Sequence, residues 1–172
     1  MQPQPYGTYE TIDGRPAVRF ERRLAHPVEK VWRAVTEPDE LAHWFPATVT
    51  VELEPGGAMS FDFGGGMTME GAVTDLDPPR TFAFRWGTEH LRIELEPDGD
   101  GCRLTFTHVL DDEDTAARNA AGWHVCLDRL AARLAGEAPE APDSAATPEW
   151  RAHYDAYIER GVPSGAPIPS AS

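Results

Sequence analysis

The stretch GCRLTFTHVLDDEDTAARNAAGWHVCLDRLAARLAG, residues 101–136, decides the fold because its hydrophobic period changes halfway. The first part alternates apolar and polar side chains, which predicts a β-strand. Asp111 or Asp112 can then cap a helix from about Glu113 to Ala135, which Gly136 closes. A strand is therefore followed directly by a long amphipathic helix. One face of this helix carries Ala116, Ala120, Trp123, Leu127, Leu130 and Leu134.

The chain before this stretch predicts a series of antiparallel strands. From Ala47 to Val109 the hydrophobic period is two, and turn signals rich in glycine, proline and aspartate separate the runs. Near the N-terminus, Asp13-Gly14 predicts a tight hairpin between strands at Thr8–Ile12 and Ala17–Leu24. Short connections make neighbouring strands antiparallel. The sheet then has one apolar face, which the long helix can cover.

Two short helices are predicted between the hairpin and the later strands. Val28 to Val35 has helical spacing after Pro27, and Thr36 with Asp39 resembles a capping box for a second helix that extends to Trp44. The order of strand pair, two short helices, strand series and long helix is the topology of the helix-grip fold. The predicted fold class is therefore α+β, a curved antiparallel sheet around one long C-terminal helix.

The length of 172 residues supports one sizeable core, so a single domain is predicted. We expect the helix-grip domain to span residues 1–136, with a linker rich in proline and alanine at 137–146. Thr147-Pro148 starts a further helix, which we expect to dock over residues 147–160. The proline- and serine-rich residues 161–172 are expected to form a flexible tail.

The charge and the cysteines exclude several functions. The net charge of -14, from 15 basic and 29 acidic residues without a basic cluster, argues against nucleic acid as a partner. No apolar run reaches the length of a membrane span and no signal peptide is visible, so we expect a cytoplasmic protein without membrane insertion. Cys102 and Cys126 lack the spacing of a metal site or a disulfide framework, so we expect two reduced thiols, no metal and no cofactor.

Three motifs carry a resemblance to a known family. They are RFERRLAHPVEKVWRAVTEPDELAHWFPA at 19–47, GAVTDLDPPRTFAFRW at 71–86 and AGWHVCLDRLAARLAG at 121–136. They resemble bacterial proteins similar to the C-terminal domain of the activator of Hsp90 ATPase, within the SRPBCC or START-like superfamily. The resemblance implies a small cytosolic domain with a cavity, whose relatives bind lipids, hormones or polyketides or act as cyclases. No stretch corresponds to the separate N-terminal domain with which the eukaryotic activator contacts the chaperone.

The apolar face of the predicted sheet is unusually rich in aromatic and thioether side chains. Such residues fill cores as well as pockets, so each of them has a plain core role as its alternative. On the helix, Ala116, Ala120 and Gly122 are small enough to leave space opposite them. We therefore expect a ligand pocket between the sheet and the long helix. The predicted pocket residues are Trp44, Phe61, Phe63, Met69, Phe84, Trp86, Phe106, His108, Trp123 and Leu127.

Few residues suggest catalysis. His108 points inward by strand parity, but no acidic or nucleophilic partner stands at a defined spacing, so no catalytic residue is predicted. His124 is expected on the solvated flank of the long helix. Arg22 has the parity of an apolar face, and a buried charge is costly unless it is paired. Arg22 therefore lies either at the rim of the sheet or in an ion pair, for which Glu70 or Asp75 could be the partner, and we expect the rim.

Three classes of function remain open from the sequence. The preferred one is the binding or carriage of an apolar small molecule, which needs only a pocket and a rim. The second is a module that interacts with a chaperone, and the third is an enzyme of the cyclase or hydrolase type. A binding role is favoured over an enzyme because no catalytic set is visible. We expect the chain to be a monomer or a weak homodimer.

Overall fold

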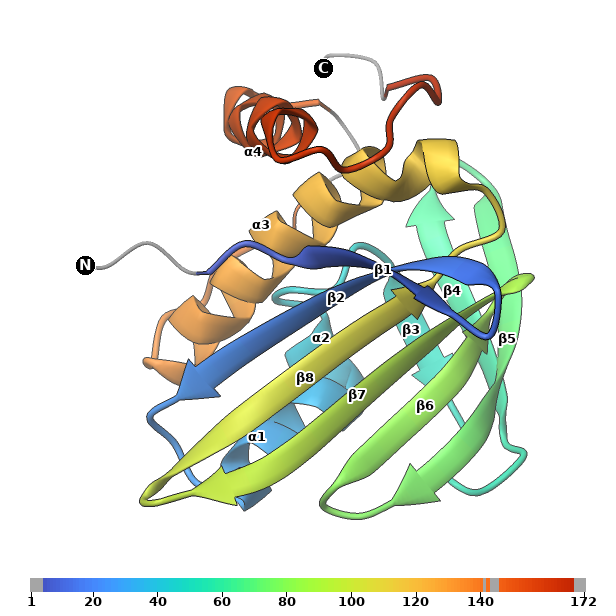
Figure 1. The fold of residues 1–172 in the computed structure, drawn as a ribbon. Coiled ribbons are helices and arrows are strands. Elements are labelled where there is room, and N and C mark those ends of the chain that lie inside the picture. The colour runs from blue at the N-terminus through green and yellow to red at the C-terminus, as the bar shows by residue number, and fades with distance from the viewer. Residues whose placement is uncertain (1–4, 141, 143–145, 169–172) are drawn as a thin grey trace.

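The sheet of this protein has eight antiparallel strands. The computed structural model describes residues 5–140, 142 and 146–168. The strands follow one another in the order β1-β2-β8-β7-β6-β5-β4-β3, and they curve around one helix (Figure 1). Their bounds are β1 (Thr8–Ile12), β2 (Arg15–Leu24), β3 (Thr48–Val51), β4 (Ala58–Gly64), β5 (Met67–Asp77), β6 (Thr81–Trp86), β7 (Glu89–Asp98) and β8 (Gly101–Val109).

Helix α3 lies across the concave side of this sheet, as the helix-grip prediction requires (Figure 1). Helix α4 packs mainly against α3. Among the described residues, no helix combines the length and apolar character needed to cross a bilayer. The helices are α1 (Val28–Thr36), α2 (Pro38–Leu41), α3 (Ala116–Leu134) and α4 (Pro148–Glu159), and a 3-10 turn, Glu113–Thr115, precedes α3.

The local signals read from the sequence had mixed outcomes. The hairpin at Asp13-Gly14 is confirmed, and both residues have the positive φ angles, 51° and 80°, of a type I′ turn. The capping box at Thr36 is wrong, because its hydroxyl donates to the Trp32 carbonyl at 2.7 Å and so ends α1 instead of starting α2. Helix α2 is correspondingly short and stops at Leu41 rather than at Trp44.

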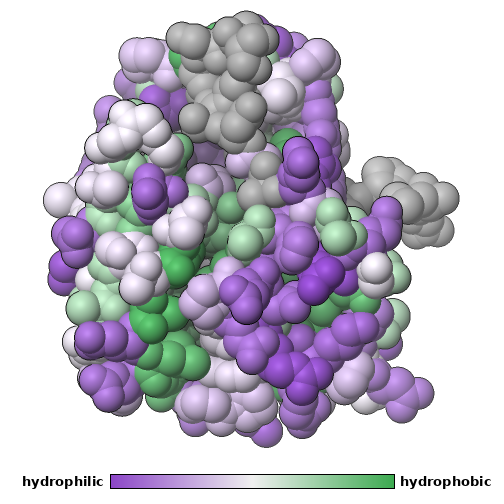
Figure 2. Space-filling model, turned by 180° about the vertical axis from the view of Figure 1, so that it is seen from behind, coloured by the Kyte–Doolittle hydropathy of each residue, from purple (hydrophilic) through white to green (hydrophobic). Residues whose placement is uncertain are grey.

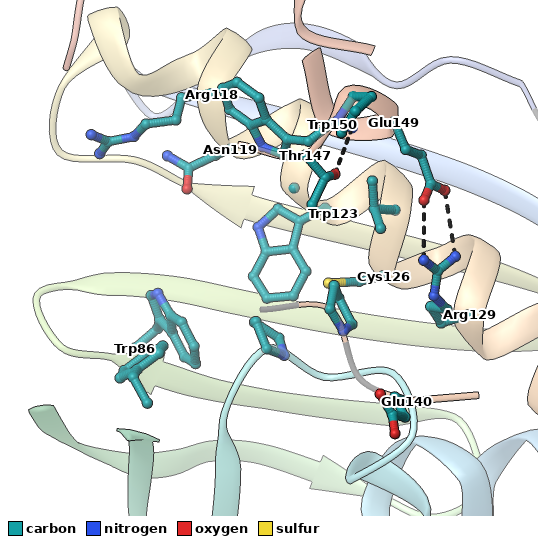
Figure 3. Close-up of a pocket in the computed structure, with 16 residues that line it drawn as sticks. Trp86, Arg118, Asn119, Trp123, Cys126, Arg129, Glu140, Thr147, Glu149 and Trp150 are labelled. Carbon is teal, nitrogen blue, oxygen red and sulfur yellow. Dashed lines mark hydrogen bonds and ion pairs between the residues drawn. The ribbon is translucent and has the colours of Figure 1, made fainter. Parts of the chain in front are cut away.

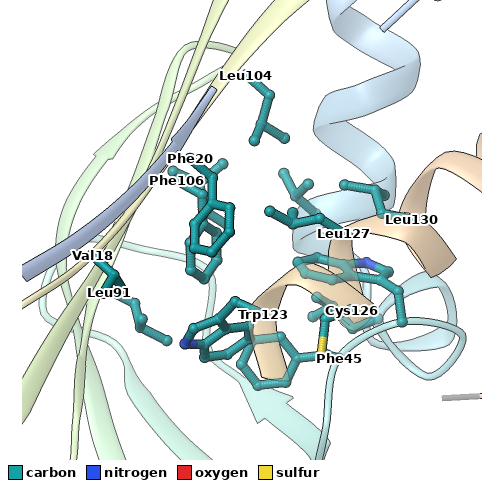
Figure 4. Packing of buried hydrophobic residues seen from close by; sticks show 14 of the residues in the cluster. Val18, Phe20, Phe45, Leu91, Leu104, Phe106, Trp123, Cys126, Leu127 and Leu130 are labelled. Atoms are coloured by element: carbon teal, nitrogen blue, oxygen red, sulfur yellow. The ribbon is translucent and has the colours of Figure 1, made fainter. Parts of the chain in front are cut away.

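The space between sheet and α3 is filled by packed side chains. Phe20 from β2 and Phe106 from β8 face each other edge to face, with ring centroids 6.3 Å apart. Leu127 and Leu130 from α3 approach the same cluster (Figure 4). Because both the strand and the helix residues are almost fully buried, this region is a solid core.

Arg22 contradicts the expectation of a rim position. Its side chain is only 3% exposed, and the register between β2 and β8 continues through it without a bulge. Neither expected partner reaches it, since Asp75 pairs instead with Arg92 at 3.2 Å. Strand parity was therefore right and placed Arg22 inside, where it lies 5.5 Å from the centroid of the Phe20 ring.

The C-terminal part of the chain returns to α3. Thr147 accepts a hydrogen bond from the Trp150 amide at 3.1 Å and caps α4. After α4, the Pro163 carbonyl accepts a hydrogen bond from the Ala117 amide at 2.9 Å, so the described part of the predicted tail is held at the start of α3. Residues 141 and 143–145 of the predicted linker and residues 169–172 of the predicted tail lie outside the described residues.

Candidate ligand-binding cleft

A cleft of about 600 Å³ opens on the flank of α3, beside the core rather than inside it. One side is formed by the ends of β4 and β6 and by the chain at Pro46, and the other by α3 and the start of α4 (Figure 3). Figure 2 views the molecule from the side opposite to Figure 1 and shows apolar residues gathered among hydrophilic ones on that side. The lining residues are Pro46, Phe63, Trp86, Arg118, Asn119, Gly122, Trp123, Val125, Cys126, Arg129, Glu140, Pro142, Thr147, Pro148, Glu149 and Trp150.

Three aromatic rings form the continuous apolar wall between sheet and helix. Phe63 at the end of β4 contacts Trp86 edge to face, with centroids 5.5 Å apart. Trp86 in turn lies 5.9 Å from Trp123 of α3. Trp123 is 4% exposed, so it belongs to the core and to the cleft wall at once. The wall offers flat apolar surface to a ligand.

A buried hydrogen-bond chain fixes the orientation of Trp123. Its indole N–H donates to His108 Nδ1 at 2.8 Å, and His108 Nε2 lies 2.7 Å from a carboxylate oxygen of Glu89. Because Nδ1 accepts, the proton of a neutral His108 must sit on Nε2 and point at Glu89. Both ring nitrogens are thus engaged, and His108 has no free lone pair to act as a general base.

Glu89 completes this chain as its charged end. Burial by itself would raise the pKa of Glu89, but the hydrogen bond from His108 and the backbone amide of Asp111 outweigh it, so the pKa is lowered. The Asp111 amide donates to the second carboxylate oxygen at 2.9 Å. The set Glu89, His108 and Trp123 therefore acts as a support for the cleft wall.

The opposite wall is contributed by α4. Trp150 stacks on Tyr154 with centroids 4.8 Å apart. Arg129 of α3 binds both carboxylate oxygens of Glu149, at 3.0 and 3.4 Å, and this ion pair closes one end of the cleft (Figure 3). At Gly122 an added Cβ would lie 3.8 Å from the Trp150 indole nitrogen, an ordinary contact distance. The absence of a side chain at Gly122 leaves part of the cleft open.

Of the ten residues predicted to form the pocket, Phe63, Trp86 and Trp123 line this cleft. Met69 is partly buried and packs against the edge of the core. The other six are packed in the core with exposures of 2% or less, namely Trp44, Phe61, Phe84, Phe106, His108 and Leu127.

The sequence reasoning missed the contribution of α4 and of the outer flank of α3. Asn119, Gly122, Cys126 and Arg129 recur at spacings of three and four, which places them on one face of the helix. This second stripe is mixed in polarity, so a search for apolar periodicity does not find it. The signal in the sequence that could have indicated the cleft is this stripe of small and polar residues next to the apolar stripe of the same helix.

Fold and cleft together define the class of the protein. A curved antiparallel sheet that grips a long helix, with a cleft beside that helix, is a helix-grip domain of the START-like class of ligand-binding domains. The model of the family described as activator of Hsp90 ATPase homolog 1-like protein matches residues 25–135, and the chain belongs to this family. Comparison with curated protein sequences gave no match.

Solved structures from several bacteria share the fold. CalU16 from Micromonospora echinospora has a TM-score of 0.70 at 24% identity and covers 90% of this chain and 92% of its own. The conserved protein of unknown function EF2215 from Enterococcus faecalis has a TM-score of 0.73 at 24% identity, covering 90% and 89%. A protein encoded by BPP1335 of Bordetella parapertussis has a TM-score of 0.67 at 25% identity, covering 99% and 97%. DynU16, from the dynemicin biosynthetic locus, is 27% identical with a TM-score of 0.65, and 49% of its length is covered.

Proposed function

We propose that the protein binds an apolar small molecule in the cleft between α3, α4 and the ends of β4 and β6. The observation that carries this proposal is the aromatic wall of Phe63, Trp86 and Trp123, which borders a volume of about 600 Å³. Ligand sites of small molecules commonly enclose about 300 to 1,000 Å³ and combine apolar walls with a few polar groups. Arg118, Asn119 and the pair Arg129–Glu149 supply such groups at the edge.

The proposal is limited to binding because the buried histidine of the core is already engaged. His108 is held between Trp123 and Glu89 and does not line the cleft. A cyclase or hydrolase would need an acid or base that can reach the ligand. His108 therefore offers no general base to the cleft, and the proposed role is the binding or carriage of the ligand.

A cleft-filling substitution tests the proposal directly. Gly122→Leu places a branched side chain into the cleft beside Trp150, whereas Gly122→Ala adds only a methyl group at ordinary contact distance. Both changes favour the helix, so both variants should fold. An apolar fluorophore should bind the wild type and Gly122→Ala at one saturable site and lose at least about tenfold in affinity for Gly122→Leu. Equal binding to all three proteins, or no saturable binding to the wild type, would contradict the proposal.

A chaperone partner is the second candidate, and the family match is the observation that favours it. Addition of the protein to purified Hsp90 should then raise the rate of ATP hydrolysis in a saturable manner. Gly122→Leu provides the internal comparison, because a surface contact with the chaperone does not require an open cleft. An unchanged ATPase rate at excess protein excludes this role.

A further inference from the structure

A second group of polar side chains lies between α3 and α4, apart from the cleft. It consists of His124 and Asp128, one turn apart on α3, and His153 on α4. Each offers one metal-binding atom, and these atoms all lie within 4.8 Å of one another. His124 Nε2 and Asp128 Oδ2 are 4.0 Å apart, and the imidazole of His124 is 3% exposed. None of the three lines the cleft.

Two atoms of this group are buried without a hydrogen-bond partner among the described residues. They are Asp128 Oδ1 and His153 Nδ1. Buried polar atoms in native proteins are almost always bonded to protein, water or an ion. A carboxylate oxygen and an imidazole nitrogen that are both unbonded, next to a second imidazole, are available to bind an ion between the two helices.

His124 is oriented in the manner of a metal ligand. Its Nδ1 lies 2.8 Å from the hydroxyl of Tyr157, and that hydroxyl accepts a hydrogen bond from the Gly7 amide at 2.9 Å. In the neutral tautomer that carries its proton on Nδ1 and donates it to the Tyr157 hydroxyl, the ring leaves Nε2 free as a lone-pair donor. A hydrogen bond from the remote nitrogen is the usual support of a ligating histidine.

We propose that His124, Asp128 and His153 form a binding site for a divalent transition-metal ion of the zinc kind, which joins α3 to α4. Two imidazoles and one carboxylate favour zinc over magnesium or calcium, which prefer oxygen ligands. Three protein ligands leave a fourth position for water.

Ion binding requires a small rearrangement of the site. The ligand atoms of a tetrahedral zinc ion lie about 3.4 Å apart, so the separation of 4.0 Å between His124 and Asp128 must contract. The rings of His124 and His153 are stacked with centroids 3.9 Å apart and planes 26° apart, so one ring must turn to aim its nitrogen at a shared ion. His153 is the ring that turns, because it is partly exposed while His124 is fixed by Tyr157.

Arg22 acts against a bound cation. Its guanidinium is buried beside this group, with Nε and Nη2 lacking partners among the described residues. Its positive charge limits the affinity for the ion, and a second oxygen of a metal-bound Asp128 can accept from it. We therefore expect binding that is selective for the type of metal but weaker than that of structural zinc sites.

Titration of the tag-free protein with Co²⁺ tests the site, since tetrahedral cobalt has a visible absorption band that Zn²⁺ abolishes by competition. The wild type should bind one Co²⁺ per chain. Asp128→Asn and His153→Ala should bind it at least tenfold more weakly, and both residues are partly exposed, so the fold should survive. His43→Ala removes a histidine that bonds the Pro139 carbonyl elsewhere, and it should bind like the wild type.

Three results would overturn the proposal: no saturable band for the wild type, equal binding by Asp128→Asn and His153→Ala, or an equal loss in His43→Ala. Circular dichroism of each variant establishes that it is folded before titration. A Zn²⁺-dependent rise in the thermal midpoint of the wild type supports the site without any variant, and its absence at saturating Zn²⁺ counts against it.

Discussion

Replacing Trp123 by alanine tests whether one side chain serves both as core and as cleft wall. Its ring centroid lies 4.7 Å from that of Phe106 and 5.5 Å from that of Phe45, so two of its sides are packed in the core (Figure 4). Its indole N–H is the donor to His108. The remaining side borders the cleft, where fewer contacts are lost on truncation.

The expected cost follows from these two contributions. Truncation of a buried Trp to Ala costs about 3 to 5 kcal/mol in the free energy of unfolding, and the open side of Trp123 places it at the lower end. Leaving His108 Nδ1 without its donor adds about 1 kcal/mol or more. We therefore expect Trp123→Ala to lower the free energy of unfolding by about 4 kcal/mol.

Urea unfolding measures this cost, and Trp123→Phe is the matched control. Phenylalanine keeps most of the ring packing but loses the N–H, so it should cost about 1 to 2 kcal/mol. Both variants should also bind an apolar fluorophore with an affinity that differs from that of the wild type. A cost below about 2 kcal/mol for the alanine variant would refute the core role. Equal costs for both variants would show that the hydrogen bond to His108, rather than the packing, carries the effect.

Three further predictions concern the sheet, the pH dependence and the thiols. Gly71→Ala should lower the free energy of unfolding by about 3 kcal/mol or more in urea melts, because the new Cβ would lie 2.1 Å from the Arg85 carbonyl oxygen on β6. A cost near zero would show that β5 and β6 can move apart locally to accommodate the methyl group. Burial lowers the pKa of His124 from its ordinary value of 6.5 to about 3 in the folded protein. The unfolded chain therefore takes up a proton first, and the stability present above pH 6.5 is lost as the pH falls toward 3. The free energy of unfolding should fall by about 2 to 3 kcal/mol between pH 6.5 and about pH 4.5, and a flat profile would contradict the burial of this ring. Cys102 and Cys126 are both buried and free, so a thiol reagent should find two thiols after unfolding and react slowly before it; fast reaction in the native state would contradict their burial.

The order of elements could be predicted from the sequence because the signals for them are local. The change of period at residues 101–136 predicts a strand followed by a helix, and both are present as β8 and α3. The hairpin at Asp13-Gly14 was also predictable, because the positive φ angles of its turn are favoured by these two residues themselves and not by distant contacts. Helix α2 was extended too far because the hydroxyl of Thr36 has two possible partners, and the structure uses the one within α1.

The polar interior could be predicted less well, because it depends on contacts between distant segments. Parity alone placed Arg22 inside, but the cost of a buried charge led to the expectation of a rim position. Its surroundings come from α3 and α4, more than one hundred residues away, where Asp128 and Tyr157 act on its charge. Likewise His124, expected on a solvated flank, is covered by α4 and by His153, which stacks on it.

The position of the cleft shows why small residues on a helix are ambiguous in a sequence. Ala116 and Ala120 were expected to leave space between α3 and the sheet, yet both are buried with exposures of 0% and 1%. At this end of the helix the chain after α4 approaches closely enough for the Ala117 amide to bond the Pro163 carbonyl. A small side chain on a helix permits either a cavity or a close approach of backbone, and only the distant segment decides between them. Here Ala116 and Ala120 are packed in the core and Gly122 borders the open volume, so the cleft lies beside α3, next to α4, rather than beneath α3.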